Sequence, residues 1–316
     1  MKPANPTLND IQGSFEALSN QGRNFEINRQ DWAFFPGGHF QGIQFFHGAE
    51  PRLAISSSSR RNAYVVICRL DDLGGQPAGQ VINVTGLSGR PLKHAGGIQA
   101  IGKVFVVGVE DDEKQDRSQV QFLQLEDRNP IPQLIPHLTI QRKGDIRVST
   151  AGAAGIVDDG RRYVLAVGSW DSATIDFYTA GPNAFDDQPE SFAKLKTWTQ
   201  SEAERSGWSD PSYLNYQSLN LVRSKEAAGG FALYLLGFAR RGRKDLLDLF
   251  RVDLEQEPPR MLVKKGRKHM IAGNGVNFSR GAGVSVDSPD RIRIFAVRGT
   301  SGSASGGGTI VCSVFD

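Results

Sequence analysis

The sequence has 316 residues, 36 of them glycine, and its 37 basic residues nearly balance its 34 acidic ones, giving a formal net charge of +3. So small a charge provides no general attraction to nucleic acid or to an anionic membrane. No run approaches the roughly 20 apolar residues that a membrane-spanning helix needs, and the N-terminal MKPANPTLND lacks the apolar run of a signal peptide. We expect a protein with no nucleic-acid or membrane partner, in the cytoplasm unless a signal peptide has been removed.

A short string of residues, His-x-x-Gly-Ile-Gln, occurs twice, as HFQGIQ from His39 and as HAGGIQ from His94. Three weaker copies follow, AAGIV, SLNLV and GAGVSV, at spacings of about 55 to 65 residues. The positions that fall in register in the five copies are Gly42, Gly97, Gly155, Asn220 and Gly283. A fixed period of this length is typical of a repeat architecture.

Each copy predicts four strands in the same order. A strand rich in small residues comes first, and an apolar strand such as FVVGVED from Phe105 follows. An alternating third strand (SQVQFLQLED from Ser118) and a more polar fourth strand (FAKLKTWTQ from Phe192) complete the unit. Four short strands at a period near 60 are typical of one propeller blade. The predicted units cover residues 37–90, 91–147, 148–200, 213–270 and 278–316, the last completed by residues 10–20.

The two ends of the chain indicate how the repeat closes. The last copy stops at its third strand, GGGTIVCSVFD, while the N-terminal IQGSFEALS is a spare segment that we predict to be a strand. Pairing it into the last unit would remove an open sheet edge. The whole chain, residues 1–316, therefore resembles the all-β five-bladed β-propeller superfold as a single domain, without pointing to one family. A pair of β-sandwich domains is the alternative, but it leaves the repeat unexplained.

The cysteines, Cys68 and Cys312, both lie in apolar strand-like runs. That setting is typical of buried free thiols. Their number and spacing favour neither a disulfide framework nor a zinc site.

The resemblance implies that one mouth of the central channel gathers residues from all five units. In a propeller, the loops that lead into the innermost strands and those that follow the second strands surround that mouth. The innermost strands would contribute His39, Gln41, His94, Tyr216, Gln217 and Arg280, and the ends of the second strands Glu110, Trp170, Asp171, Arg240 and Arg298. These residues differ from copy to copy, which favours one asymmetric ligand site over several equivalent ones.

His39 and His94 are the candidate acid and base, since imidazole titrates near neutral pH, with Glu110 as their carboxylate partner. We expect the rest of the acidic run 110–113 to be solvated. Two alternatives stay open. The histidines could hold loop carbonyls, or they could ligate a divalent metal with Glu110 or Asp111, although no ligand spacing such as HExxH supports a metal. The sequence leaves the metal and any other cofactor unknown.

The remaining mouth residues suit ligand binding. Trp170 and Asp171 could offer a stacking surface and a carboxylate, with packing between blades as the alternative for the tryptophan. Arg240, Arg280 and Arg298 could bind a carboxylate or phosphate, because guanidinium groups suit planar anions; scattered surface arginines are the alternative. We also expect Gln41 and Tyr216 to contact the ligand.

Two segments near the mouth are candidate functional loops. The segment GTSGSASGGG, residues 299–308, is flexible by composition and could act as a lid. The longer segment 201–216 carries Trp208, Tyr213 and Tyr216, and long loops in compact domains are often functional. Tolerated extra length is the alternative for both segments.

Familiar reaction signatures are missing from the sequence. We find no phosphate-binding loop, no GxSxG elbow and no paired-carboxylate motif of five-bladed glycosidases. The mouth residues favour a single-site enzyme, a hydrolase, lyase or isomerase, acting on a small polar or anionic molecule. The alternatives are a glycan- or peptide-binding propeller and a protein-interaction scaffold, and whether the chain is an enzyme at all stays open, as does its oligomeric state.

Overall fold

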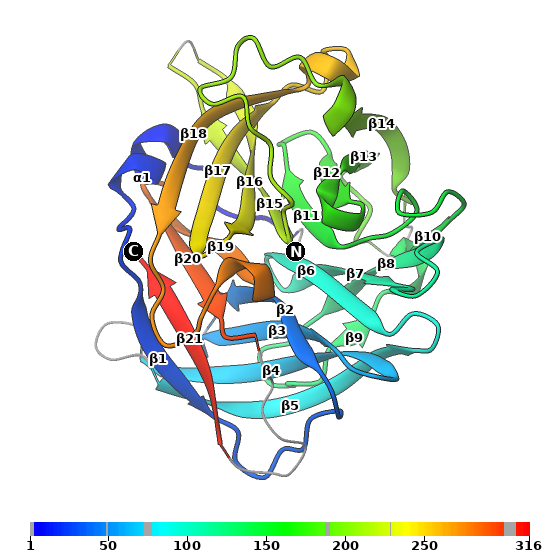
Figure 1. The fold of residues 1–316 in the computed structure, drawn as a ribbon, viewed down its shortest axis with the longest axis vertical. Coiled ribbons are helices and arrows are strands. Elements are labelled where there is room, and N and C mark those ends of the chain that lie inside the picture. The colour runs from blue at the N-terminus through cyan, green and yellow to red at the C-terminus, as the bar shows by residue number, and fades with distance from the viewer. Residues whose placement is uncertain (1–2, 49, 73–77, 187–189, 228, 300–307) are drawn as a thin grey trace.

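The structure is a computed structural model that describes residues 3–48, 50–72, 78–186, 190–227, 229–299 and 308–316. Its secondary structure is almost entirely strand (Figure 1). The strands fall into five successive units, which we number in chain order. In the described residues we find no helix with the length and apolar character needed to cross a membrane.

The bounds of the elements are as follows. Unit 1 contains β2 (His39–Phe46), β3 (Arg52–Ser58), β4 (Asn62–Asp72) and β5 (Ala78–Gly89). Unit 2 contains β6 (His94–Ile101), β7 (Val104–Glu110), β8 (Arg117–Gln124), β9 (Gln133–Leu134) and β10 (Ile140–Lys143). Unit 3 contains β11 (Ala153–Asp158), β12 (Tyr163–Gly168), β13 (Thr174–Ala180) and β14 (Ala193–Thr199). Unit 4 contains β15 (Ser218–Lys225), β16 (Phe231–Arg241), β17 (Lys244–Val252) and β18 (Leu262–Met270). Unit 5 contains β19 (Ala282–Ser288), β20 (Arg291–Val297), β21 (Thr309–Phe315) and β1 (Arg23–Asn28). Helix α1 (Ile11–Ala17) precedes β1, and the 3₁₀ turns are η1 (Pro136–Leu138), η2 (Trp170–Ser172), η3 (Gln200–Glu202), η4 (Pro258–Arg260) and η5 (Phe278–Arg280).

Within each unit, strands that follow one another along the sheet pair antiparallel. Two parallel pairings join units: β1 with β5, and β6 with β11 through a single residue pair. The sheets therefore have eight, nine and four strands. The described residues also form apolar clusters between neighbouring units, such as the one in which Phe177 of β13 and Phe250 of β17 lie together. Packing of this kind buries both faces of each unit.

The innermost strands β2, β6, β11, β15 and β19 contact one another around the centre (Figure 1). Their approach is close enough to require glycine. A Cβ on Gly97 would lie 2.8 Å from Ser218 Cα, and a Cβ on Gly42 would lie 2.8 Å from the backbone nitrogen of Ile98. The small residues of the repeat are therefore explained by the close approach of backbones.

Side-chain amides link these inner strands where their backbones do not pair. Gln99 Nε2 donates to the Leu221 carbonyl at 2.7 Å, and Gln99 Oε1 accepts from Leu221 N–H at 2.8 Å. In the same way, Asn220 Oδ1 accepts from Val284 N–H at 2.7 Å, and Gln44 Nε2 donates to the Val284 carbonyl at 2.8 Å. Buried backbone groups must find partners, and the glutamine of the repeated string supplies them.

The N-terminal segment differs from the prediction. Residues 10–20 do not form the closing strand, because most of them form α1 and the turn after it. Asp10 caps this helix by accepting hydrogen bonds from Gln12 N–H and Gly13 N–H. Ile11 and Phe15, one helical turn apart, are both buried. The strand that pairs antiparallel with the C-terminal β21 is β1, a few residues further along the chain.

The aromatic side chains of the segment 201–216 are buried, whereas about half of its residues are exposed. Trp208 Nε1 donates to the Leu262 carbonyl at 2.9 Å, and the Tyr213 hydroxyl donates to the Ser172 carbonyl at 2.8 Å. These contacts anchor the segment to the strands beside it. Of the candidate lid, residues 300–307 lie outside the described residues. Cys68 and Cys312 are buried free thiols, as predicted.

Candidate functional site

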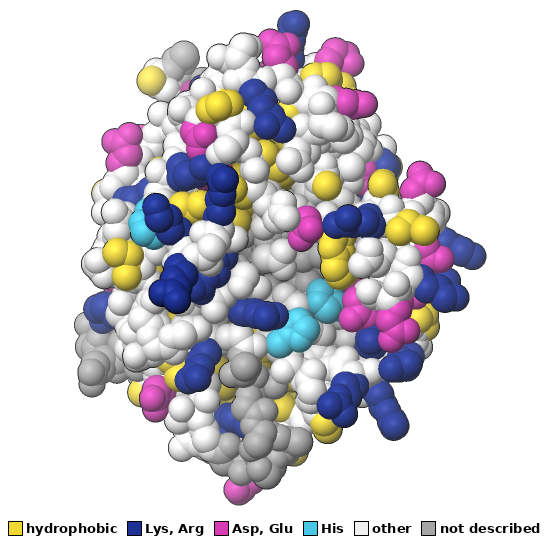
Figure 2. All heavy atoms as spheres, viewed as in Figure 1, with side chains coloured by type: hydrophobic (Ala, Val, Ile, Leu, Met, Phe, Trp, Pro, Cys, Tyr) yellow, Lys and Arg dark blue, Asp and Glu magenta, His cyan; other side chains and the backbone are white. Residues whose placement is uncertain are grey.

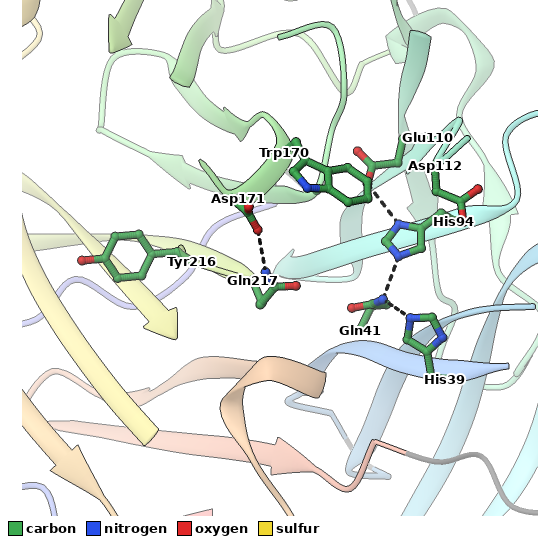
Figure 3. A pocket seen from close by; sticks show the side chains of 10 residues that line it. His39, Gln41, His94, Glu110, Asp112, Trp170, Asp171, Tyr216 and Gln217 are labelled. Carbon is green, nitrogen blue, oxygen red and sulfur yellow. Dashed lines mark hydrogen bonds and ion pairs between the residues drawn. The ribbon is translucent and has the colours of Figure 1, made fainter. Parts of the chain in front are cut away.

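A cavity of about 350 Å³ opens at one end of the inner strands (Figure 3). This volume is large enough for a small molecule. Residues from units 1 to 4 line it, namely His39, Gln41, His94, Glu110, Asp112, Gly152, Trp170, Asp171, Tyr216 and Gln217. Concave sites with a few converging polar groups are the usual place for ligands.

His94 and Glu110 form the most constrained pair in the cavity. They are direct cross-strand partners of β6 and β7, and His94 Nδ1 lies 3.0 Å from Glu110 Oε1. The carboxylate is only 1% exposed, and its other oxygen accepts a hydrogen bond from Ala151 N–H at 2.8 Å. The contact is an electrostatic one and not a hydrogen bond, because His94 Nδ1 has no partner of hydrogen-bond geometry among the described residues. The other ring nitrogen, Nε2, faces Gln41.

Gln41 links the two histidines. Its Nε2 lies 2.7 Å from His94 Nε2 and also contacts His39 Nε2 (Figure 3). A side-chain amide has two N–H groups, so it can donate to both rings when each ring offers a lone pair. The ring centroids of His39 and His94 are 5.7 Å apart. The four side chains therefore form one polar chain, Glu110–His94–Gln41–His39.

Irregular pairing at the ends of the inner strands turns these side chains toward the cavity. The register of β2 against β3 shifts between Phe40 and Gly42, at Gln41. The register of β6 against β7 shifts at the equivalent place, between Ala95 and Ile98. Bulges re-aim side chains and are common next to active sites. The repeated string of the sequence thus contains a repeated bulge, which its letters alone do not reveal.

His39 is kept neutral. Burial, together with the neighbouring charges of His94 and Arg280, lowers its pKa to about 4 against the opposing effect of Asp112. At neutral pH the ring is therefore a hydrogen-bond acceptor or a base, and not a cation.

The wall contributed by unit 3 carries an aromatic ring and a second carboxylate. The Trp170 ring lies 6.2 Å from the His94 ring between centroids, and Asp171 accepts from Gln217 Nε2 at 3.5 Å (Figure 3). Asp171 has a φ of 58°, a left-handed conformation that costs free energy in a non-glycine residue. Arg147 lies 3.3 Å from its other oxygen. The Asp171 carboxylate beside a partly exposed indole ring suits the binding of a polar ring.

A second hollow, of about 430 Å³, adjoins the cavity and shares His39 with it. Its other lining residues come from unit 5 and the segment before it: Gly275, Asn277, Arg280, Arg298 and Gly299. Figure 2 shows neighbouring histidine side chains (cyan) near the centre of the view, with a basic side chain to their left and acidic side chains to their right, beyond which further basic side chains lie.

The structure does not bring all the predicted residues to the cavity in a form that can bind a ligand. Tyr216 borders it, but its hydroxyl points away from the histidines (Figure 3) and donates to the buried carboxylate of Asp248. Arg240 lines neither hollow, because its guanidinium lies 3.8 Å from Asp245 and donates to the Gly242 carbonyl. Both side chains are drawn away by partners within unit 4.

Two features of the acidic run 110–113 were not expected. Asp112 lines the cavity, although nothing in the sequence distinguishes it from the rest of the acidic run. Asp111 is buried, and its carboxylate accepts hydrogen bonds from Glu113 N–H and Lys114 N–H in the turn after β7. Among the described residues, no group of three or more His, Cys, Asp or Glu side chains is placed to hold a metal ion.

Comparison with known proteins supports the fold class. No protein-family model and no curated protein matches the sequence. Among solved structures, a β-fructofuranosidase from Schwanniomyces occidentalis is similar, with a TM-score of 0.51 and 10% identity over 90% of this chain and 58% of that one. The α-L-arabinofuranosidase Arb93A from Fusarium graminearum has a TM-score of 0.47 and 9% identity over 92% and 96% of the two chains. This chain thus spans little more than half of the first enzyme. The likeness confirms an all-β, propeller-like fold and assigns no family.

Proposed function

We propose that this chain is a single-site hydrolase that acts on a small, sugar-like molecule at one mouth of a five-bladed β-propeller. The proposed blades are the five units, closed by β1, within one domain. The pairing of β1 with β21 and the apolar clusters between neighbouring units support that count. The proposal of a sugar-like substrate is supported by the similar solved structure, which is a β-fructofuranosidase. Of the three enzyme classes that the sequence left open (hydrolase, lyase and isomerase), we select the hydrolase.

One observation carries the proposal: a buried carboxylate, Glu110, lies against Nδ1 of His94 at the wall of a cavity. Such a carboxylate fixes the ring and stabilises the imidazolium that forms when Nε2 accepts a proton. In the proposed reaction the attacking water takes the place of the Gln41 amide at His94 Nε2, and His94 takes a proton from that water. The leaving group takes up a proton from solvent as its bond to the sugar breaks, and His94 afterwards returns its proton to solvent. Gln41 and neutral His39 position the water.

The other side chains of the cavity suit sugar binding. The Trp170 ring offers an apolar face on which a sugar ring can stack. Asp171 and Gln217 add a carboxylate and an amide beside it, and these can bind sugar hydroxyls. The ligand is therefore proposed to lie between Trp170 and the two histidines.

The test is the release of reducing sugar from a panel of small glycosides and oligosaccharides. His94→Gln and Glu110→Gln should each lower kcat by about 10²- to 10⁴-fold, the usual contribution of a general acid or base. His137→Gln is the matched control, since His137 is exposed in η1 and does not line the cavity. Saccharide binding without turnover in the unaltered protein would contradict the hydrolase and favour a glycan-binding propeller.

A further inference from the structure

The hollow beside the cavity is built from residues that the proposed hydrolysis does not use. It has about 430 Å³, and its polar side chains are His39, Asn277, Arg280 and Arg298. Only His39 belongs to both hollows. A molecule that lies against His94 can therefore extend past His39 toward the two arginines.

Each arginine lies against a glycine that leaves room for it. A Cβ on Gly299 would lie 2.3 Å from Arg280 Cγ, and a Cβ on Gly275 would lie 3.3 Å from Arg298 Nε. Both arginine side chains are exposed, so a ligand in the hollow can reach them. A side chain at position 299 would meet Arg280 at its Cγ, and one at position 275 would be in tight contact with Arg298.

The backbones that carry the arginines are fixed. The turn η5 begins where the buried Asp245 carboxylate accepts a hydrogen bond from Phe278 N–H at 2.9 Å. Within the same turn, Arg280 N–H donates to the Asn277 carbonyl at 3.2 Å. Arg298 N–H donates to the Val311 carbonyl of β21 at 2.9 Å. The two side chains therefore project from positions that the fold determines.

The positive charge of this hollow has no carboxylate beside it. Within the described part of the chain, no Asp or Glu oxygen lies within 4.0 Å of either Arg280 or Arg298. By contrast, Arg267 contacts Asp248 at 2.6 Å, and Arg293 contacts Asp287 at 2.7 Å. The acidic residues of the site, Glu110, Asp112 and Asp171, line only the first cavity. Two guanidinium groups held together in this way favour an anion.

We propose that the hydrolase substrate is an acidic saccharide, whose carboxylate binds between Arg280 and Arg298 while its sugar ring lies in the cavity with His94. This inference rests on the proposed function and names its substrate class. Guanidinium groups match a planar carboxylate with paired N–H donors. Sulfate and phosphate esters share the negative charge, so the experiment must separate them from the carboxylate.

The experiment compares the binding of galacturonate with that of its methyl ester, which has the same ring without the charge, by isothermal titration calorimetry. We expect galacturonate to bind at least about tenfold more tightly, since charge-assisted hydrogen bonds contribute that much. Arg280→Gln with Arg298→Gln should abolish the preference. Arg243→Gln is the matched control, because Arg243 is an exposed arginine of unit 4 that lines neither hollow.

Equal binding of acid and ester by the unaltered protein would overturn the inference. So would a preference that survives the double substitution, or arginine-dependent binding of inorganic sulfate with none of galacturonate. The proposed function is judged separately. If the protein hydrolyses only neutral saccharides, the proposed hydrolase stands and the acidic substrate is contradicted. If it binds galacturonate through the arginines but hydrolyses no saccharide, the anion site is supported and the hydrolase is contradicted. His94→Gln should keep the preference for the acid.

Discussion

Gln41 and His94 come from the innermost strands of different units, and yet the Gln41 amide nitrogen lies 2.7 Å from His94 Nε2. The same nitrogen contacts His39. The amide thus favours the neutral form of His39, because a ring nitrogen whose lone pair accepts a hydrogen bond cannot also bind a proton. This relationship is directly testable.

Gln41→Glu should raise the pKa of His39 from about 4 toward its ordinary value of 6.5. A carboxylate between the two rings would favour their charged forms and accept hydrogen bonds from both. The pKa can be followed by NMR titration of the imidazole protons. Gln217→Glu is the control, since Gln217 lines the cavity but contacts Asp171. An equal rise in both variants would show that general charge in the cavity, and not the Gln41 contact, sets the pKa.

The stability of the protein should fall as pH decreases from 6.5 to 4 partly because of His39. Its folded pKa is about 4 and its ordinary value is 6.5, so within this window the unfolded chain binds a proton that the folded one does not. Above the window there is no effect, and below it the loss is complete at up to about 3 kcal/mol. Urea unfolding at pH 7 and at pH 4.5 should show a smaller loss in His39→Asn. An identical loss in both proteins would rule out this role of His39.

Asp248→Ala should destabilise the fold strongly. Its buried carboxylate contacts Lys264 Nζ at 2.9 Å and also contacts Arg267. It accepts a hydrogen bond from the Tyr216 hydroxyl. Removing it leaves the fully buried Lys264 without its closest counter-charge, which costs about 3–5 kcal/mol. The free energy of unfolding in urea measures this loss.

Asp71→Ala is the matched control for that experiment, because Asp71 forms an exposed ion pair with Arg69 at 3.7 Å. Such pairs contribute about 0–1 kcal/mol. Comparable losses in the two variants would mean that the Asp248 cluster is not a coupled buried network.

Gly97→Ala should destabilise the ring of inner strands, because the new Cβ would lie 2.8 Å from Ser218 Cα and 2.7 Å from the Gln217 carbonyl oxygen. Backbone atoms cannot move aside cheaply, and overpacking of this kind costs about 1–3 kcal/mol. The comparison is Gly86→Ala in β5, where a Cβ would meet nothing within 4 Å. Thermal unfolding of both variants tests the prediction, and a drop in Tm for Gly86→Ala as large as for Gly97→Ala would contradict it.

The sequence identified the repeat, and the repeat was sufficient to place His39 and His94 side by side. Both head the same short string, so any fold that stacks the copies around an axis brings their first residues together. The same reasoning placed Glu110, Trp170 and Asp171 near them. It misread the N-terminus, where the Asp10 cap and the one-turn spacing of Ile11 and Phe15 indicate a helix.

Tertiary structure decided what each side chain does. The Tyr216 hydroxyl turns to Asp248, and Arg240 turns to Asp245, because the free energy of a long polar side chain depends on partners that are distant in sequence. Gln41 faces both histidines only because a bulge in β2 turns it there. Periodicity along a chain fixes which strands recur. It does not determine which polar groups of different strands pair with one another, since that depends on distances that exist only after folding.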